Sequence, residues 1–109
     1  MQQELTHARA LFNRQEFFAA HEAFEDLWRA AAGDDKDVLK AITQVAVALH
    51  HHSTGNLTGA RGVLARAARG LASAPPRFHE LDLARLRADL ARWQAYLAGD
   101  PPQPPFPLL

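Results

Sequence analysis

Apolar side chains recur every three or four residues through most of this 109-residue chain, and no segment alternates between apolar and polar residues. This spacing places the apolar side chains on one face of a helix, whereas a half-buried strand needs alternation. The pattern is interrupted at Gly33, at Gly55 and in the run SAPPR at 73–77, where glycine or proline ends a helix. The sequence therefore predicts an all-α, single-domain bundle of about five helices, with no strands.

The expected helices occupy residues 3–13, 17–32, 36–54, 57–71 and 83–98. Asn56 and Asp82 are the expected caps of the last two helices, and Asp34 or Asp35 that of the third. The third helix is apolar almost all round in its middle, which is typical of a helix at the centre of a bundle. A short turn at Gly33 joins it to the second helix. These two helices are therefore expected to pack as an antiparallel central pair.

The carboxyl-terminal run DPPQPPFPLL has too many prolines for a helix and is expected to be an extended, polyproline-like chain. The expected domain organisation is a helical bundle over residues 1–100 and a Pro-rich tail over residues 101–109. The tail carries three large apolar side chains, Phe106, Leu108 and Leu109. Such side chains gain free energy by packing on the bundle or on a partner chain, and a disordered end is the alternative.

Charge and composition exclude several classes of protein. Twelve basic and twelve acidic residues give a formal net charge of zero, so nucleic acid is not an expected partner. No apolar run approaches the roughly 18 residues of a membrane span, so no membrane association is expected. The beginning of the chain lacks the basic and apolar regions of a signal peptide. Because there is no cysteine, disulfides and thiolate chemistry are excluded, and a cytoplasmic location is the expectation.

The stretch FFAAHEAFEDLWR at 17–29 places ionisable side chains at the edge of an apolar helix face. His21 and Glu25 are one helical turn apart, so their side chains can meet, and Phe18 and Trp28 bracket them on the helical wheel. Polar groups in such a position cost about 1–3 kcal/mol each unless they find partners. We therefore expect His21 and Glu25 to be more buried than is usual for their residue types.

Partners for these two groups are expected on the third helix. Antiparallel packing from the turn at Gly33 brings Gln44 and His51 to heights similar to those of Glu25 and His21. The predicted polar cluster consists of His21, Glu22, Glu25, Gln44 and His51, with Trp28 as an apolar wall. We expect Glu25 or His21 to reach Gln44 or His51 across the helix interface, directly or through one water.

Three consecutive histidines occupy positions 50–52. Neighbouring residues on a helix point about 100° apart, so the three rings cannot share one metal ion. Only His51 is expected to point toward the cluster, with His52 at the edge of the core and His50 on the far side of the helix.

Two kinds of role fit the predicted cluster. Imidazole and carboxylate groups can gather a divalent metal, for which His21, Glu25 and His51 are the candidate ligands, or act as an acid–base pair. The same groups can form a hydrogen-bonded polar knot that fixes the register of two packed helices. The spacing favours the knot, because the motif at His21 lacks the second histidine of an H-E-x-x-H zinc helix and is not the Glu-x-x-His motif, of which a di-iron bundle needs two copies. No cofactor is therefore expected, with a divalent metal as the alternative.

Three motifs in order resemble one known family. FFAAHEAFEDLWR contains the pattern A-H-E-x-x-E-x-x-W, and it is followed by AITQVAVALHH and then by GNLTGA. This order is similar to that of the family called domain of unknown function 309, over about residues 12–71. The resemblance implies a similar helical bundle, and it implies the label of a predicted metal-dependent hydrolase that this family sometimes carries. By position, the resemblance assigns the family's polar residues to His21, Glu22, Glu25, Trp28 and Gln44.

The sequence therefore predicts a small, non-catalytic structural or partner-binding module that associates with a second copy or with another protein. A metal-dependent hydrolase is the alternative function. A small-ligand binding protein, with Trp28 lining its pocket, is the third class. An open cleft at the cluster would favour the enzyme, whereas an exposed apolar patch elsewhere would favour the interaction module.

Overall fold

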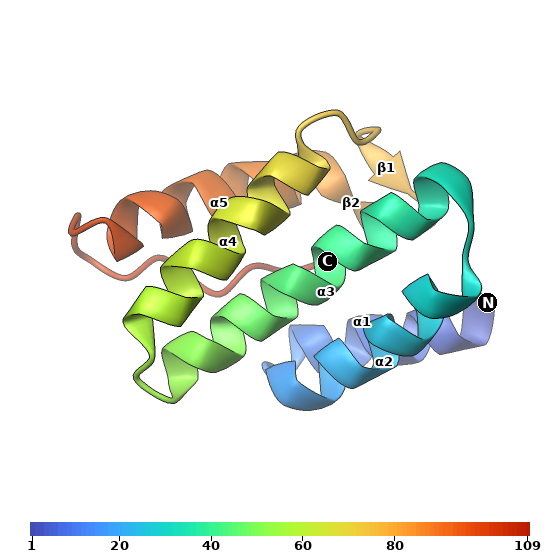
Figure 1. The fold of residues 1–109 in the computed structure, drawn as a ribbon, viewed down its shortest axis with the longest axis horizontal. Coiled ribbons are helices and arrows are strands. Elements are labelled where there is room, and N and C mark those ends of the chain that lie inside the picture. The colour runs from blue at the N-terminus through green and yellow to red at the C-terminus, as the bar shows by residue number, and fades with distance from the viewer.

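The computed structural model describes all 109 residues and packs five helices around one apolar core (Figure 1). The helices are α1 (Gln2–Asn13), α2 (Phe17–Ala30), α3 (Gly33–Ser53), α4 (Leu57–Leu71) and α5 (Leu83–Leu97). Helix α3 lies between α2 and α4 and packs along both of them. The predicted all-α fold is confirmed, and so is the contact between the second and third helices.

Every helix contributes fully buried apolar side chains to the core. Examples are Phe12 of α1, Phe24 of α2, Ile42 of α3, Leu64 of α4 and Trp93 of α5. Helix α3 buries residues toward both of its neighbours, which is why its middle section is apolar nearly all round. None of the helices combines the length and the hydropathy that crossing a membrane requires.

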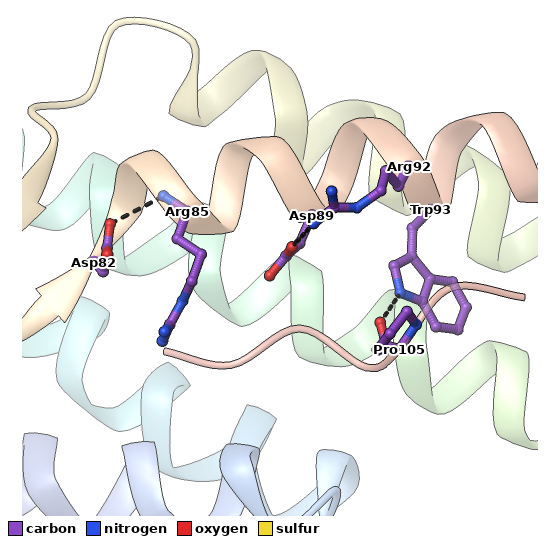
Figure 2. Close-up of polar contacts among 6 residues, drawn as sticks. All are labelled: Asp82, Arg85, Asp89, Arg92, Trp93 and Pro105. Atoms are coloured by element: carbon purple, nitrogen blue, oxygen red, sulfur yellow. Dashed lines mark hydrogen bonds and ion pairs between the residues drawn. The ribbon is translucent and has the colours of Figure 1, made fainter.

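Side-chain caps begin the last two helices at the predicted residues. The Asn56 carboxamide oxygen accepts a hydrogen bond of 2.9 Å from the backbone N–H of Gly59 at the start of α4. The Asp82 carboxylate accepts one of 3.0 Å from the backbone N–H of Arg85 at the start of α5 (Figure 2). Each such cap stabilises its helix by about 1 kcal/mol.

Helix α3 begins earlier than predicted. Its first residue is Gly33, so Asp34 and Asp35 lie within the first turn and neither caps the helix. Carboxylates in this turn are still favourable, because they face the positive end of the helix dipole. The turn between α2 and α3 consequently shrinks to Ala31 and Ala32, which holds the two helices close together.

The prediction that the chain has no strands was wrong at one short hairpin. Arg77–Phe78 (β1) pairs antiparallel with Leu81–Asp82 (β2) in a ladder of two residues per strand. His79 turns the chain between them with a φ of 53°. The hairpin buries Phe78 and Leu81 against the core. Strands this short give no alternating pattern, so the sequence carries no periodic signal for them.

The Pro-rich tail packs on the bundle, which decides between the alternatives for the chain end. It runs back beneath α5 toward the middle of the molecule (Figure 1). Leu109 is fully buried and Phe106 is half-buried, whereas Leu108 is 46% exposed. Of the three apolar side chains of the tail, two therefore join the core, and neither a partner chain nor a disordered end is needed to account for them.

Candidate functional site

The residues of the predicted cluster come from α2 and α3. The line of contact between these two helices is called here the α2–α3 seam. At one end of the seam, the rings of Phe18 and His50 pack with their centroids 5.1 Å apart. At the other end, the ammonium groups of Lys36 and Lys40 lie 5.6 and 5.9 Å from the centroid of the Trp28 ring. The early part of α2 thus meets the late part of α3. The two helices are antiparallel in the predicted register.

His21 is half-buried, but its hydrogen bond is local. Its Nδ1 atom lies 2.6 Å from the carbonyl oxygen of Phe18, one turn earlier in α2. Because a carbonyl oxygen can only accept, the Nδ1 atom carries the proton and donates it. The His21 ring also packs edge-on against the Phe18 ring, with centroids 5.0 Å apart. These contacts fix the position of His21 without any group from α3.

Glu25 also pairs within α2. Its carboxylate lies 3.2 Å from the guanidinium group of Arg29, and the two side chains are 35% and 66% exposed. Gln44 is half-buried, but no polar side-chain atom in the protein is both buried and unpaired, so solvent reaches its amide. Direct hydrogen bonds from Glu25 or His21 to Gln44 or His51 do not form. The predicted direct contact is therefore wrong, and a contact through one water stays a prediction.

The three consecutive histidines face three different neighbours. The His50 ring meets Phe18, which corrects the prediction that His50 lies on the far side of α3. The Nδ1 atom of His51 lies 3.4 Å from the side-chain nitrogen of Asn56 in the turn after α3, so His51 does not join the cluster. His52 packs edge-on against Trp93, with ring centroids 5.0 Å apart, at the predicted edge of the core.

The residues present do not fit a metal ion at this position. The structure brings no three His, Asp or Glu side chains close enough together to bind one. The candidate ligands His21, Glu25 and His51 each turn to a different local partner. Glu22 is exposed at the surface of α2 and adds no fourth donor. We therefore derive no metal-dependent step from these side chains.

Trp28 packs on the edge of the core and carries cations on its exposed side. In addition to the two lysines of α3, the Arg29 guanidinium carbon lies 6.0 Å from the ring centroid. Such cation–π contacts contribute about 0.5–1 kcal/mol each at exposed sites. Trp28 lines none of the three main hollows of the surface. Its position is that of a wall against the lysines.

The largest of the three main hollows lies on the other side of α2. It is a groove of about 720 Å³ between α1 and α2, with Ala23, Leu27 and Ala30 among its apolar residues and Glu4 and Asp26 among its acidic ones. A backbone hydrogen bond and then the neighbouring N-terminal ammonium group lower the pKa of the Glu4 carboxyl. None of the residues of the predicted cluster lines this groove.

A second hollow, of about 380 Å³, opens at the Phe18 end of the seam. Phe17, Phe18, Ala19 and His50 line it, together with polar residues of the turn before α2. The prediction from sequence placed His50 outside the site. A helical wheel of α3 with the face toward α2 moved by one residue, from His51 to His50, would have included it. The middle of the seam, where an enzyme would need its cleft, carries none of the three main hollows.

Replacing Glu25 by alanine is expected to cost less than about 1 kcal/mol of unfolding free energy. The cluster predicted from sequence would have made this cost larger, because a buried partner would have been left unpaired. In the structure, the substitution removes only a partly exposed ion pair with Arg29. Thermal unfolding of Glu25→Ala and Glu25→Gln, compared with the parent, tests this. A markedly larger loss in Glu25→Ala that Glu25→Gln restores would instead support a water-bridged contact with Gln44.

Comparison with known proteins places the seam in a recognised family. Residues 5–63 match the family described as Domain of unknown function (DUF309), and this range holds all of α2 and α3. An uncharacterized protein of Aquifex aeolicus (strain VF5) is 29% identical over 87 residues, which cover 79% of this chain and 26% of that protein. The chain thus spans about a quarter of the length of this curated relative. Because the family match covers more than half of the chain, the protein belongs to the DUF309 family.

Proposed function

We propose that this chain is a non-catalytic helical module that binds a second copy of itself through the surface around Phe18. One observation carries the proposal. The Phe18 side chain is 53% exposed, more than any other large apolar side chain of the protein, and yet its neighbours hold it in place. An exposed aromatic ring of this kind is typical of the anchor of a protein interface.

The surroundings of Phe18 fix its ring before any partner arrives. The His21 ring packs on it from within α2, and the His50 ring packs on it from α3. The hydrogen bond from His21 to the Phe18 carbonyl oxygen holds the first of these rings in turn. A side chain that is already ordered loses little conformational entropy on binding, so more of its contact energy contributes to affinity.

The hollow beside Phe18 supports a second copy as the partner. A protruding ring and a hollow lie next to each other, because Phe17, Ala19 and His50 line the hollow that Phe18 borders. Such a surface is self-complementary: in a twofold symmetric dimer, each Phe18 ring can enter the hollow of the other copy. The formal net charge of zero leaves no overall repulsion between two copies.

The arrangement of the polar groups supports a binding role over hydrolysis. His21, Glu25 and His51 turn to separate local partners, so these three groups form neither a metal donor set nor an acid–base pair. The matched region makes up only 26% of the Aquifex aeolicus relative, which is consistent with a module that acts within a larger protein. The proposed module needs no cofactor.

Substituting Phe18 by serine is expected to weaken self-association by at least about tenfold, since an interface anchor contributes about 2 kcal/mol or more. Sedimentation equilibrium of the parent and the variant over a wide concentration range measures the dimer dissociation constant. Leu57→Ser is the matched control, because Leu57 is 48% exposed and does not line the hollow. The control should keep the dissociation constant of the parent.

Two results would reject this proposal. The first is a parent chain that stays monomeric at every concentration. The second is a dimer whose dissociation constant is the same in Phe18→Ser and in Leu57→Ser. Circular dichroism distinguishes misfolding from a lost contact, because removing an exposed side chain should change the unfolding free energy by only about 0.5 kcal/mol.

A further inference from the structure

We infer that the groove beneath α5 is a binding site for an extended, Pro-rich peptide, and that residues 104–109 are its displaceable resident ligand. The groove is formed by Trp93 of α5, Phe17 at the start of α2, and Arg9 and Asn13 of α1. Two of these helices are the first and the last of the fold. Trp93 and the tail lie outside the residues that match the family, so membership of the family does not imply this site.

Side chains of the bundle contact the backbone of the tail. The indole N–H of Trp93 donates a hydrogen bond of 2.9 Å to the carbonyl oxygen of Pro105 (Figure 2). The backbone N–H of Leu109 donates one of 2.8 Å to the carboxamide oxygen of Asn13. The Leu109 carbonyl oxygen accepts from Arg9 Nε at 2.8 Å and from Asn13 Nδ2 at 3.4 Å. Contacts of this kind hold an extended main chain in register whatever the side chains are.

The side chains of Phe106, Pro107 and Leu109 supply the specificity. The Phe106 ring stacks on Trp93 with centroids 5.4 Å apart, and it packs on Phe17 at 5.6 Å. Leu109, three residues later, is fully buried. Pro107, between them, is buried as well, whereas Pro105 and Leu108, three residues apart, are exposed. The extended, Pro-rich backbone is that of a polyproline-like chain. The groove therefore selects an aromatic residue, a proline directly after it and a leucine three positions after the aromatic residue.

The tail is attached to the bundle in a way that makes it separable. Residues 98–103, between α5 and the bound segment, are all exposed. The linker thus keeps the bound segment close to the groove, and its own side chains are not buried against the bundle. A short flexible linker gives its ligand an effective concentration in roughly the millimolar range. A groove of modest intrinsic affinity would stay filled by its own tail under these conditions, and a second segment of the same chemistry would have to compete with it.

The test uses the full chain with a specific protease site in place of residues 99–103. The protein folds with its tail in the groove and is then cut, so the tail remains as a non-covalent fragment. A fluorescent peptide of sequence PPQPPFPLL is added, and its polarisation is measured. We expect saturable binding to the cut protein, with the bundle still helical by circular dichroism. Binding to the uncut protein should be at least about tenfold weaker, because its own tail competes.

Matched variants show whether the binding uses the groove. A peptide with serine in place of the residues equivalent to Phe106 and Leu109 should not bind. In the cut protein, Asn13→Ala should raise the dissociation constant of the parent peptide by about fivefold, since it removes the hydrogen bonds to Leu109. If the protease site prevents folding, the uncut double variant Phe106→Ser, Leu109→Ser is used instead. Its tail lacks the two side chains that enter the groove, so the variant should bind the peptide.

Three outcomes would overturn the inference. The fragment could stay in the groove against a large excess of peptide, which would make it a permanent part of the core. The bundle could lose its helical signal when the fragment leaves, which would also make the fragment a permanent part of the core. The serine peptide could bind as well as the parent peptide, which would make the contact nonspecific. Failure of the Phe18 dimer would leave this result untouched, because Phe18 and His50, the two residues that carry the dimer proposal, do not contribute to the groove. Phe17 borders both surfaces, and no variant in either test changes it.

Discussion

Replacing Trp93 by alanine is expected to lower the free energy of unfolding by about 3–5 kcal/mol, the usual cost of deleting a fully buried aromatic side chain. The Trp93 side chain has no exposed surface. It packs against His52, Tyr96 and Phe106, which come from α3, from α5 itself and from the tail. Its removal would therefore leave a cavity where three parts of the fold meet, and it would also release the Pro105 carbonyl oxygen.

Urea unfolding followed by circular dichroism measures this loss, and a thermal melt should show a fall of more than about 12 °C for a domain of this size. Trp28→Ala is the control within the same protein. Trp28 is half-buried at the edge of the core, so its loss should cost less than about 2 kcal/mol. Equal losses for the two tryptophans would contradict the structure, in which Trp93 is fully buried and Trp28 is not.

Replacing Phe24 by alanine is expected to cost about 3–5 kcal/mol as well, for a different part of the fold. Phe24 is fully buried on the face of α2 that forms the core. Six residues earlier on the same helix, Phe18 is 53% exposed. The same substitution at Phe18 should therefore change the unfolding free energy by only about 0.5 kcal/mol. It should instead weaken self-association.

This pair of variants separates folding from binding on one helix. Urea unfolding measures the stability of each variant. Sedimentation equilibrium measures self-association, at a temperature where Phe24→Ala is still folded. A dimer that Phe24→Ala weakens as much as Phe18→Ala does would show that general loosening of α2 accounts for the effect. A large stability loss in Phe18→Ala would place its ring inside the core and contradict the structure.

The sequence predicted the helices because burial repeats at the helical period, and it predicted two helix starts because Asn56 and Asp82 each cap a helix that begins directly after them. It did not predict the hairpin at 77–82, since strands of two residues have no period to detect. The sequence also did not predict where the tail packs on the bundle. Three apolar residues on a Pro-rich segment indicate that they will be buried, but not where.

For the site, the register of α2 on α3 was predictable and the contacts were not. Counting from the turn placed Glu25 and His21 at heights similar to those of Gln44 and His51. The contacts of Phe18 with His50 and of Trp28 with Lys36 and Lys40 agree with that register. The choice between a partner across the seam and a partner within α2 depends on side-chain rotamers, which a helical wheel does not contain. His21 and Glu25 both took the local partner. The sequence pattern also does not say which part of the nearly all-apolar surface of α3 faces α2, so His51 was placed in the cluster, whereas His50 makes the contact with Phe18.

The docking of the tail has a consequence for the order in which the protein folds. The hydrogen bond from Arg9 to Leu109 joins residues 100 positions apart, so it closes a loop of almost the entire chain. The entropy cost of closing a loop rises with its length, and contacts so distant in sequence form late. Asn13 and Trp93, which hold the two ends of the bound segment, come together only when the first and last helices have reached their final positions. An occupied groove therefore marks a chain that has finished folding, and the protection of the Trp93 indole proton from hydrogen exchange reports that final step separately from the formation of the helices.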